Sequence, residues 1–168
     1  MAAALAYRNA IISDLPKVVE IYNSSVASGM VTADTEPVTV QSRYAWFEAH
    51  NPETRPLWLV IEDDETVGWV SFQSFYDRPA YNATAEINIY LCPEKQNSGL
   101  GKQILQYAIN MAPQLGIKTL IGYIFAHNEP TLRLFRSFWF EDWGTLPNIA
   151  MIEGEERTLK ILGKRILP

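Results

Sequence analysis

The chain has 168 residues, the length of one ordinary domain with room for a sizeable core. Hydrophobic residues at 48% and charged residues at 20% are typical of globular proteins. The net charge of −5 comes without a basic block, which argues against a nucleic-acid-binding surface. One cysteine excludes a disulfide framework, and no apolar run approaches a membrane span. We expect a single cytoplasmic domain over residues 1–168 that binds neither nucleic acid nor membrane.

The first half of the chain is predicted to hold three strands and two helices. A strand over residues 5–12 precedes a helix that Ser13 caps, that carries Pro16 in its first turn and that ends at Gly29. The elements that follow are a loop, a second helix and the two strands of a hairpin, at residues 32–37, 40–50, 57–61 and 67–75.

The second half continues with strands and helices in alternation. In chain order they are a loop, a strand, a helix, a strand, a helix and two last strands, at residues 77–83, 85–91, 99–112, 117–125, 130–137, 140–143 and 157–162. This order predicts an α/β fold with a mixed sheet and helices on both faces.

A loop with two glycines connects the strand over 85–91 to the helix over 99–112. It reads Gln96-Asn97-Ser98-Gly99-Leu100-Gly101 and follows Cys92-Pro93. Glycines let backbone approach an anion closely, and the first N–H groups of a helix have no partner within the helix. Gly99 and Gly101 are only two residues apart, Gln103 follows Lys102, and no third glycine comes next, which excludes the Walker and Rossmann loops.

Gln-x-x-Gly-x-Gly after a strand and a proline resembles the pyrophosphate loop of the GNAT family of acetyl-CoA-dependent N-acetyltransferases. Other pieces are similar to the phosphinothricin and methionine-sulfoximine N-acetyltransferase group of that family. These pieces are Ile21-Tyr22-Asn23, Thr35-Glu36-Pro37, Arg78-Pro79-Ala80-Tyr81, Thr84-Ala85-Glu86, Tyr90 and Asn128-x-Pro130-Thr131. The resemblance implies the GNAT fold with a mostly antiparallel sheet, acetyl-CoA as co-substrate, a small amino acid or analogue as acceptor, and a homodimer.

The resemblance also implies which residues hold the cofactor. The strand segment contacts the pantetheine arm, and an extended arm with its own amides can pair with a strand edge as a peptide would. The loop holds the pyrophosphate, and Asn128 either contacts the cofactor further along or caps the helix that follows it. The predicted cofactor residues are Ile89, Tyr90, Leu91, Gln96, Asn97, Ser98, Gly99, Leu100, Gly101, Lys102 and Asn128.

Glu86 is the candidate catalytic base. Acetyl transfer to an amine requires that the amine lose a proton, and an alkyl ammonium is almost wholly charged at neutral pH. Strand alternation places Glu86, Asn88 and Tyr90 on one face and the intervening apolar residues on the other. A carboxylate among apolar neighbours has a raised pKa, which suits a base that works near neutrality. The alternative is a charge on a solvated strand face.

For oxyanion stabilisation and departure of the thiolate, the sequence offers fewer candidate residues. A backbone N–H of the Tyr90 segment is the simplest donor to the carbonyl oxygen. Many relatives carry tyrosine or histidine where this chain has Phe135, so the thiolate leaves unassisted or takes a proton from Tyr90 or Tyr123. Cys92 is expected to be a small buried hydrophobe and His127 a loop histidine. The two histidines and the cysteine lack metal-ligand spacing, so no metal is expected.

The acceptor pocket should contain a cation for an anionic group of the acceptor. By resemblance this cation is Arg78, because a guanidinium suits bidentate binding of a carboxylate or phosphinate. The predicted substrate contacts are Tyr76, Asp77, Arg78, Glu86, Ile87 and Asn88. Trp69 and Phe75 belong either to the pocket wall or to the core.

Two features keep other functions open. Trp139-Phe140 replaces the Gly-Phe usual in the family after the last helix, in a region that shapes the acceptor pocket. One alternative is a protein or peptide N-acetyltransferase, which would need an open groove and whose net acidity would favour basic peptides. A non-catalytic acyl-CoA-binding module is the other, because Phe135 cannot donate a proton.

Overall fold

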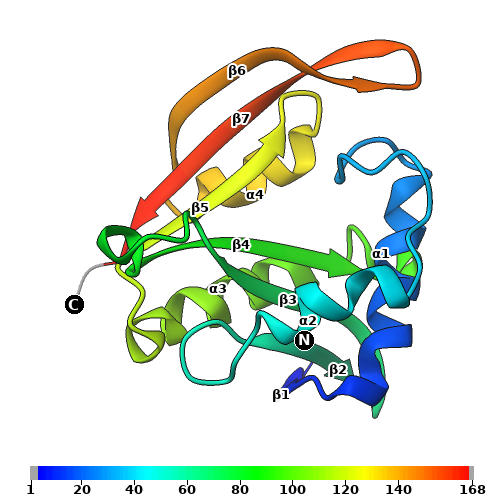
Figure 1. The fold of residues 1–168 in the computed structure, drawn as a ribbon, viewed down its shortest axis with the longest axis vertical. Coiled ribbons are helices and arrows are strands. Elements are labelled where there is room, and N and C mark those ends of the chain that lie inside the picture. The colour runs from blue at the N-terminus through cyan, green and yellow to red at the C-terminus, as the bar shows by residue number, and fades with distance from the viewer. Residues whose placement is uncertain (1–3, 167–168) are drawn as a thin grey trace.

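The computed structural model describes residues 4–166, and a seven-stranded sheet forms the centre of this region (Figure 1). Its strands lie in the order β1-β2-β3-β4-β5-β7-β6, and every neighbouring pair is antiparallel except β4 with β5. This confirms the predicted mixed, mostly antiparallel sheet. The strands are β1 (Ala6–Asn9), β2 (Leu57–Glu62), β3 (Glu65–Ser74), β4 (Thr84–Leu91), β5 (Thr119–Phe125), β6 (Glu141–Ile152) and β7 (Glu155–Arg165).

Helices cover both faces of the sheet, as predicted. They are α1 (Leu15–Val26), α2 (Tyr44–Glu48), α3 (Leu100–Met111) and α4 (Glu129–Ser137). Helices α3 and α4 pack on one face, where Ile104, Leu105 and Leu132 join the larger core cluster. Helix α1 packs on the other face through residues such as Leu15 and Val18. Burial of each such side chain contributes about 1.5–3 kcal/mol to folding.

The first strand and the first helix differ in detail from the prediction. The strand ends at Asn9, because residues Ile12–Asp14 form a 3-10 turn that leads into α1. Asp14, and not Ser13, is the N-cap residue of α1. Its carboxylate accepts the Ile11 N–H at 2.8 Å and pairs with Arg8 at 2.8 Å, so it fixes the turn from both sides.

The last two strands form a longer hairpin than the sequence predicts. Strand β6 continues past residue 143 to Ile152, and β7 begins at Glu155. A register shift lies between Leu146 and Ala150, and it contains Asn148 with a φ of +53°. Such a bulge interrupts the period-two alternation on which strand recognition depends. No helix among residues 4–166 is long and apolar enough to cross a membrane.

Candidate active site

Strands β4 and β5 separate beyond the middle of the sheet. Their parallel pairing covers only Thr84–Glu86 against Thr119–Ile121. Both strands continue further, β4 to Leu91 and β5 to Phe125, without pairing to each other. The divergence leaves one edge of β4 open on the side that faces β5 (Figure 1).

The direction of the backbone groups along β4 follows from two bonds to β3. The Thr84 carbonyl accepts the Phe75 N–H at 3.3 Å, and the Cys92 N–H donates to the Val67 carbonyl at 2.8 Å. Because peptide groups alternate along a strand, the even-numbered residues of β4 bond to β3. The N–H and C=O groups of Ile89 and its odd-numbered neighbours therefore face the open edge, where an extended chain of amides could pair with them.

The loop before α3 has the geometry of an anion cradle. Gly99 is the N-cap residue of α3 with a φ of +85°, and Asn97 has a φ of +58°. Glycine adopts such a conformation without the strain that a Cβ adds. No side chain caps α3, so the first N–H groups of the helix keep their hydrogen-bonding capacity. The Ser98 hydroxyl donates to the Lys95 carbonyl, which holds the loop together internally.

The space around Gly101 is limited by the neighbouring helix. A Cβ on Gly101 would lie 3.2 Å from Leu134 Cδ2 on α4, so a side chain there would press on the neighbouring helix. Asn128 begins that neighbouring helix. Its side chain is buried, and Oδ1 accepts the Thr131 N–H at 3.3 Å. The helix-cap alternative for Asn128 is therefore confirmed, and the cofactor contact stays a prediction.

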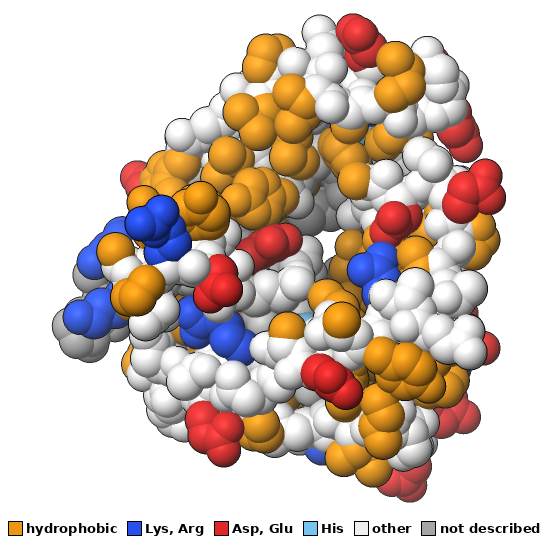
Figure 2. Space-filling model, viewed as in Figure 1, with side chains coloured by type: hydrophobic (Ala, Val, Ile, Leu, Met, Phe, Trp, Pro, Cys, Tyr) orange, Lys and Arg blue, Asp and Glu red, His pale blue; other side chains and the backbone are white. Residues whose placement is uncertain are grey.

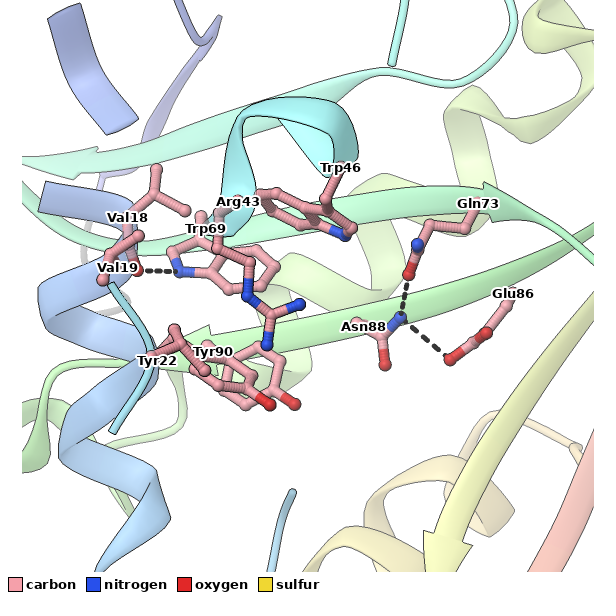
Figure 3. A pocket seen from close by; sticks show the side chains of 11 residues that line it. Val18, Val19, Tyr22, Arg43, Trp46, Trp69, Gln73, Glu86, Asn88 and Tyr90 are labelled. Atoms are coloured by element: carbon pink, nitrogen blue, oxygen red, sulfur yellow. Dashed lines mark hydrogen bonds between the residues drawn. The ribbon is translucent and has the colours of Figure 1, made fainter. Parts of the chain in front are cut away.

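A cavity of about 170 Å³ lies on the face of β3 and β4 that α1 and α2 cover (Figure 3). The side chains of Glu86, Asn88 and Tyr90 all line it, as strand alternation predicts. The apolar residues between them pack toward the opposite face, in the core cluster of α3 and α4. The cavity is lined by Val18, Val19, Tyr22, Val38, Arg43, Trp46, Trp69, Gln73, Glu86, Asn88 and Tyr90.

The environment of Glu86 changes its acidity. Burial raises the pKa of the Glu86 carboxyl, and a hydrogen bond from Asn88 acts against that rise. Asn88 Nδ2 donates to Glu86 Oε2 at 3.0 Å and to Gln73 Oε1 at 3.3 Å. The net effect is a carboxylate that binds a proton more readily than an ordinary glutamate, which suits a general base near neutrality.

The cation that lines the cavity is Arg43. Arg78, the predicted one, is exposed in the loop before β4 and is not among the described residues that line the cavity. Arg43 pairs with Asp34 at 2.9 Å and lies over the Tyr22 ring, 4.9 Å from its centroid. Sequence reasoning missed Arg43, although its spacing of three from Trp46 could have placed both on one side of the second helix.

The structure places one of the other predicted substrate contacts in the cavity and the rest outside it. Asn88 lies in the cavity beside Glu86, whereas the Ile87 side chain is buried in the core on the opposite face. Tyr76 and Asp77 are exposed in the loop with Arg78, outside the cavity lining. Of the two residues left open, Trp69 lines the cavity, and its indole N–H donates to the Val18 carbonyl at 3.0 Å. Phe75 is exposed outside the cavity lining and packs edge-on against Tyr76 and Tyr81.

The structure does not favour catalytic roles for Phe135, Cys92 and His127. Phe135 is buried, and its ring would lie 2.9 Å from a Cβ on Gly122 of β5. Burial raises the pKa of the Cys92 thiol, which makes it a poor nucleophile. His127 Nε2 lies 3.1 Å from the Gly29 carbonyl in the loop after α1. Among residues 4–166, no group of three or more histidine, cysteine or acidic side chains could hold a metal ion.

The sheet, the open β4 edge and the cradle at α3 define an acyltransferase of the GNAT class, and the chain belongs to the acetyltransferase (GNAT) family, which it matches over residues 18–140. It is 49% identical over 91% of its length, and 94% of the relative's, to the "Putative phosphinothricin acetyltransferase YwnH" of Bacillus subtilis. It is 30% identical to the L-methionine sulfoximine/L-methionine sulfone acetyltransferase of Pseudomonas paraeruginosa, over 85% of this chain and 84% of that one.

A solved structure shows the same fold. It is a GNAT superfamily phosphinothricin acetyltransferase from Sinorhizobium meliloti in complex with AcCoA. The two chains are 25% identical with a TM-score of 0.89, over 99% of this chain and 89% of the other. Both the GNAT fold and the enzyme class expected from the sequence are confirmed by these similarities.

Proposed function

We propose that this protein is an acetyl-CoA-dependent N-acetyltransferase that acetylates the amino group of a small amino acid or analogue by direct transfer. The observation that carries the proposal is a half-buried carboxylate, Glu86, that lines a cavity on β4, the strand whose open edge faces β5 and whose end leads into the cradle. The names of the relatives, which act on phosphinothricin and on methionine sulfoximine or sulfone, support this class of acceptor.

The residues present fit acetyl-CoA. The free N–H and C=O groups of Ile89 and Leu91 can pair with the amides of the pantetheine arm, and the uncapped start of α3 can bind the pyrophosphate. The N–H groups of Leu100, Gly101 and Lys102 belong to that first turn. These are the roles that we propose for the strand and for the loop from Gln96 to Lys102.

In the proposed reaction, Glu86 accepts a proton from the ammonium group of the acceptor, directly or through water. The amine nitrogen then attacks the thioester carbon, and a backbone N–H at the open β4 edge stabilises the oxyanion. When the tetrahedral intermediate collapses, the C–S bond breaks, the thiolate leaves with the bonding electron pair, and the second proton of the nitrogen passes to the thiolate or to water. Phe135 offers no proton, but a thiol with a pKa near 8.5 is an adequate leaving group.

The size of the cavity favours a small acceptor over a peptide. Its volume of about 170 Å³ is smaller than the roughly 300–1,000 Å³ of pockets for drug-sized ligands. Aromatic side chains, including Trp46, Trp69 and Tyr22, form part of its wall. We therefore place the peptide N-acetyltransferase second.

A thiol-release assay with acetyl-CoA tests the proposal. The acceptors are methionine sulfone, methionine sulfoximine, phosphinothricin, common amino acids, polyamines and short peptides, with the Glu86→Gln variant as control. We expect thiol release with the small amino acids and analogues and little with peptides. Turnover of peptides alone contradicts the proposed acceptor, and tight acetyl-CoA binding without any thiol release identifies an acyl-CoA-binding module instead.

We also propose that the protein is a homodimer. Exposed apolar side chains gather on and next to β6, and Figure 2 shows hydrophobic side chains over this upper part of the molecule. They are Trp139, Trp143, Leu146, Ile149 and Met151. An apolar surface of this kind is typical of interfaces between protein chains. Light scattering coupled to size-exclusion chromatography should give twice the chain mass, and a monomer at micromolar concentration contradicts the proposal.

A further inference from the structure

We propose that Arg43 is the specificity-determining residue that binds the anionic group of the acceptor, so that the acceptor is an amino acid with a free carboxylate. This inference rests on the proposed function. Among residues 4–166, Arg43 and Glu86 are the two charged side chains that line the cavity, and they carry opposite charges. Asn88 and Gln73, which are neutral and polar, also line it.

The two charges are arranged for a zwitterion. Figure 3 shows the Arg43 guanidinium and the Glu86 carboxyl entering the cavity from opposite sides, with Asn88 between them. An α-amino acid that places its ammonium group at Glu86 directs its carboxylate toward Arg43. The reverse orientation would bring like charges together, at a cost in a partly desolvated site. The charges therefore select both the acceptor and its orientation.

Arg43 is held in place before any acceptor arrives. Its Nη2 donates to Asp34 Oδ2 at 2.9 Å, and its Cζ lies over the Tyr22 ring, 4.9 Å from the centroid. The Tyr22 hydroxyl in turn contacts Asp34 and Thr32. A guanidinium has five N–H donors, so the bond to Asp34 leaves donors for a second anion. A fixed guanidinium loses less entropy on binding than a mobile one.

The competing role for Arg43 is structural. The loop after α1 carries Asp34. Its Val31 carbonyl accepts a hydrogen bond from the Tyr90 hydroxyl, and its Gly29 carbonyl lies 3.1 Å from His127 Nε2. In this alternative, Arg43 merely tethers the loop to α2 and does not bind the acceptor. A tether would affect every acceptor equally, whereas an anion-binding residue affects only acceptors that carry the anion.

The test compares an α-amino acid acceptor with its carboxamide, which keeps the amine and removes the charge. For Arg43→Gln we expect kcat/KM for the acid to fall about tenfold to a hundredfold, mainly through KM, because a charge-assisted hydrogen bond is lost. For the carboxamide we expect a change below about threefold. Arg43→Lys should lie between the two, because lysine keeps the charge without the planar fork.

Two variants serve as controls. Asp34→Asn weakens the tether, because the amide oxygen accepts without a charge, but leaves the guanidinium, so it should keep the preference for the acid over the carboxamide. Arg136→Gln removes another arginine that pairs with an aspartate, Asp142 at 2.8 Å, on α4 outside the cavity lining, and should leave both acceptors unaffected.

Three results would overturn the inference. They are an equal loss of kcat/KM for acid and carboxamide in Arg43→Gln, the same loss in Asp34→Asn, and a loss of kcat/KM selective for the acid in Arg78→Gln alone.

Calorimetric binding of the acid and the carboxamide gives a readout that does not depend on turnover. If the wild type releases no thiol with any acceptor, the proposed function fails. The binding preference of wild type against Arg43→Gln then still decides the role of Arg43.

Discussion

Asn88 Nδ2 donates a hydrogen bond to Glu86 Oε2 at 3.0 Å, between two side chains on the same face of β4. This bond stabilises the charged carboxylate, whereas burial of Glu86 favours the protonated form. Burial is the larger effect, so the pKa of Glu86 is raised, and Asn88 limits the rise. The two residues together set the pH range in which Glu86 can accept a proton.

Replacement of Asn88 by leucine should move the acidic limb of the pH–rate profile to higher pH. Leucine has a similar size but donates no hydrogen bond, so the pKa of Glu86 rises further. The measurement is kcat/KM against pH, which reports groups of the free enzyme. Gln73→Leu is the matched control, because Gln73 contacts Asn88 and should shift the limb less. An unmoved limb in Asn88→Leu contradicts this account.

Glu86→Gln should lower kcat by about a hundredfold or more at neutral pH, because glutamine cannot accept the proton of the ammonium group. Binding of acetyl-CoA, measured by calorimetry, should stay close to that of the wild type, since the proposed cradle lies at α3. A rate equal to that of the wild type at neutral pH would remove Glu86 from the mechanism.

The same variant should not be less stable than the wild type at pH 8. The folded-state pKa of Glu86 is raised, so above the ordinary pKa of glutamate the charge costs folding free energy. Glutamine is neutral at every pH and avoids this cost. The variant should therefore gain free energy of unfolding over the wild type at pH 8, and this gain should shrink as the pH falls toward the ordinary glutamate pKa near 4.3. Urea unfolding at pH 8 and pH 5 measures it, and a gain that grows on acidification has the wrong sign.

Gly99→Ala should weaken acetyl-CoA binding by about fivefold and lower stability by about 1 kcal/mol, because alanine is strained at a φ of +85°. Gly116→Ala is the matched control. Gly116 has a φ of +75° and, like Gly99, open space around a Cβ, but it lies after α3 and outside the proposed cradle. It should show the loss of stability without the loss of binding. Equal losses of binding in both variants argue against a cradle at Gly99.

Tyr123→Phe should change kcat by far less than the roughly hundredfold that a general acid supplies. Burial raises the pKa of Tyr123, so its hydroxyl is an even weaker acid than an ordinary phenol near 10. Transfer of its proton to a thiolate whose acid has a pKa near 8.5 is uphill. A hundredfold loss of kcat, together with a shift of the limb of the pH–rate profile that reports the general acid, identifies Tyr123 as the proton donor.

The sequence by itself determined the features that depend on near neighbours in the chain. The left-handed glycine before α3, the helix start behind it and the alternation that puts Glu86, Asn88 and Tyr90 on one face are all local. The long β6 was underestimated because the bulge at Asn148 breaks its alternation. Local patterns carry no signal for a register shift of that kind.

The tertiary structure alone decided which side chains meet in the cavity. Arg43 joins Glu86 because α2 packs over the same face of the sheet, although 43 positions separate them in the chain, while Arg78 remains exposed despite being close in sequence. The separation of β4 from β5 likewise depends on which strands each one pairs with. Contacts between distant segments follow from how whole elements pack, and no local periodicity specifies them.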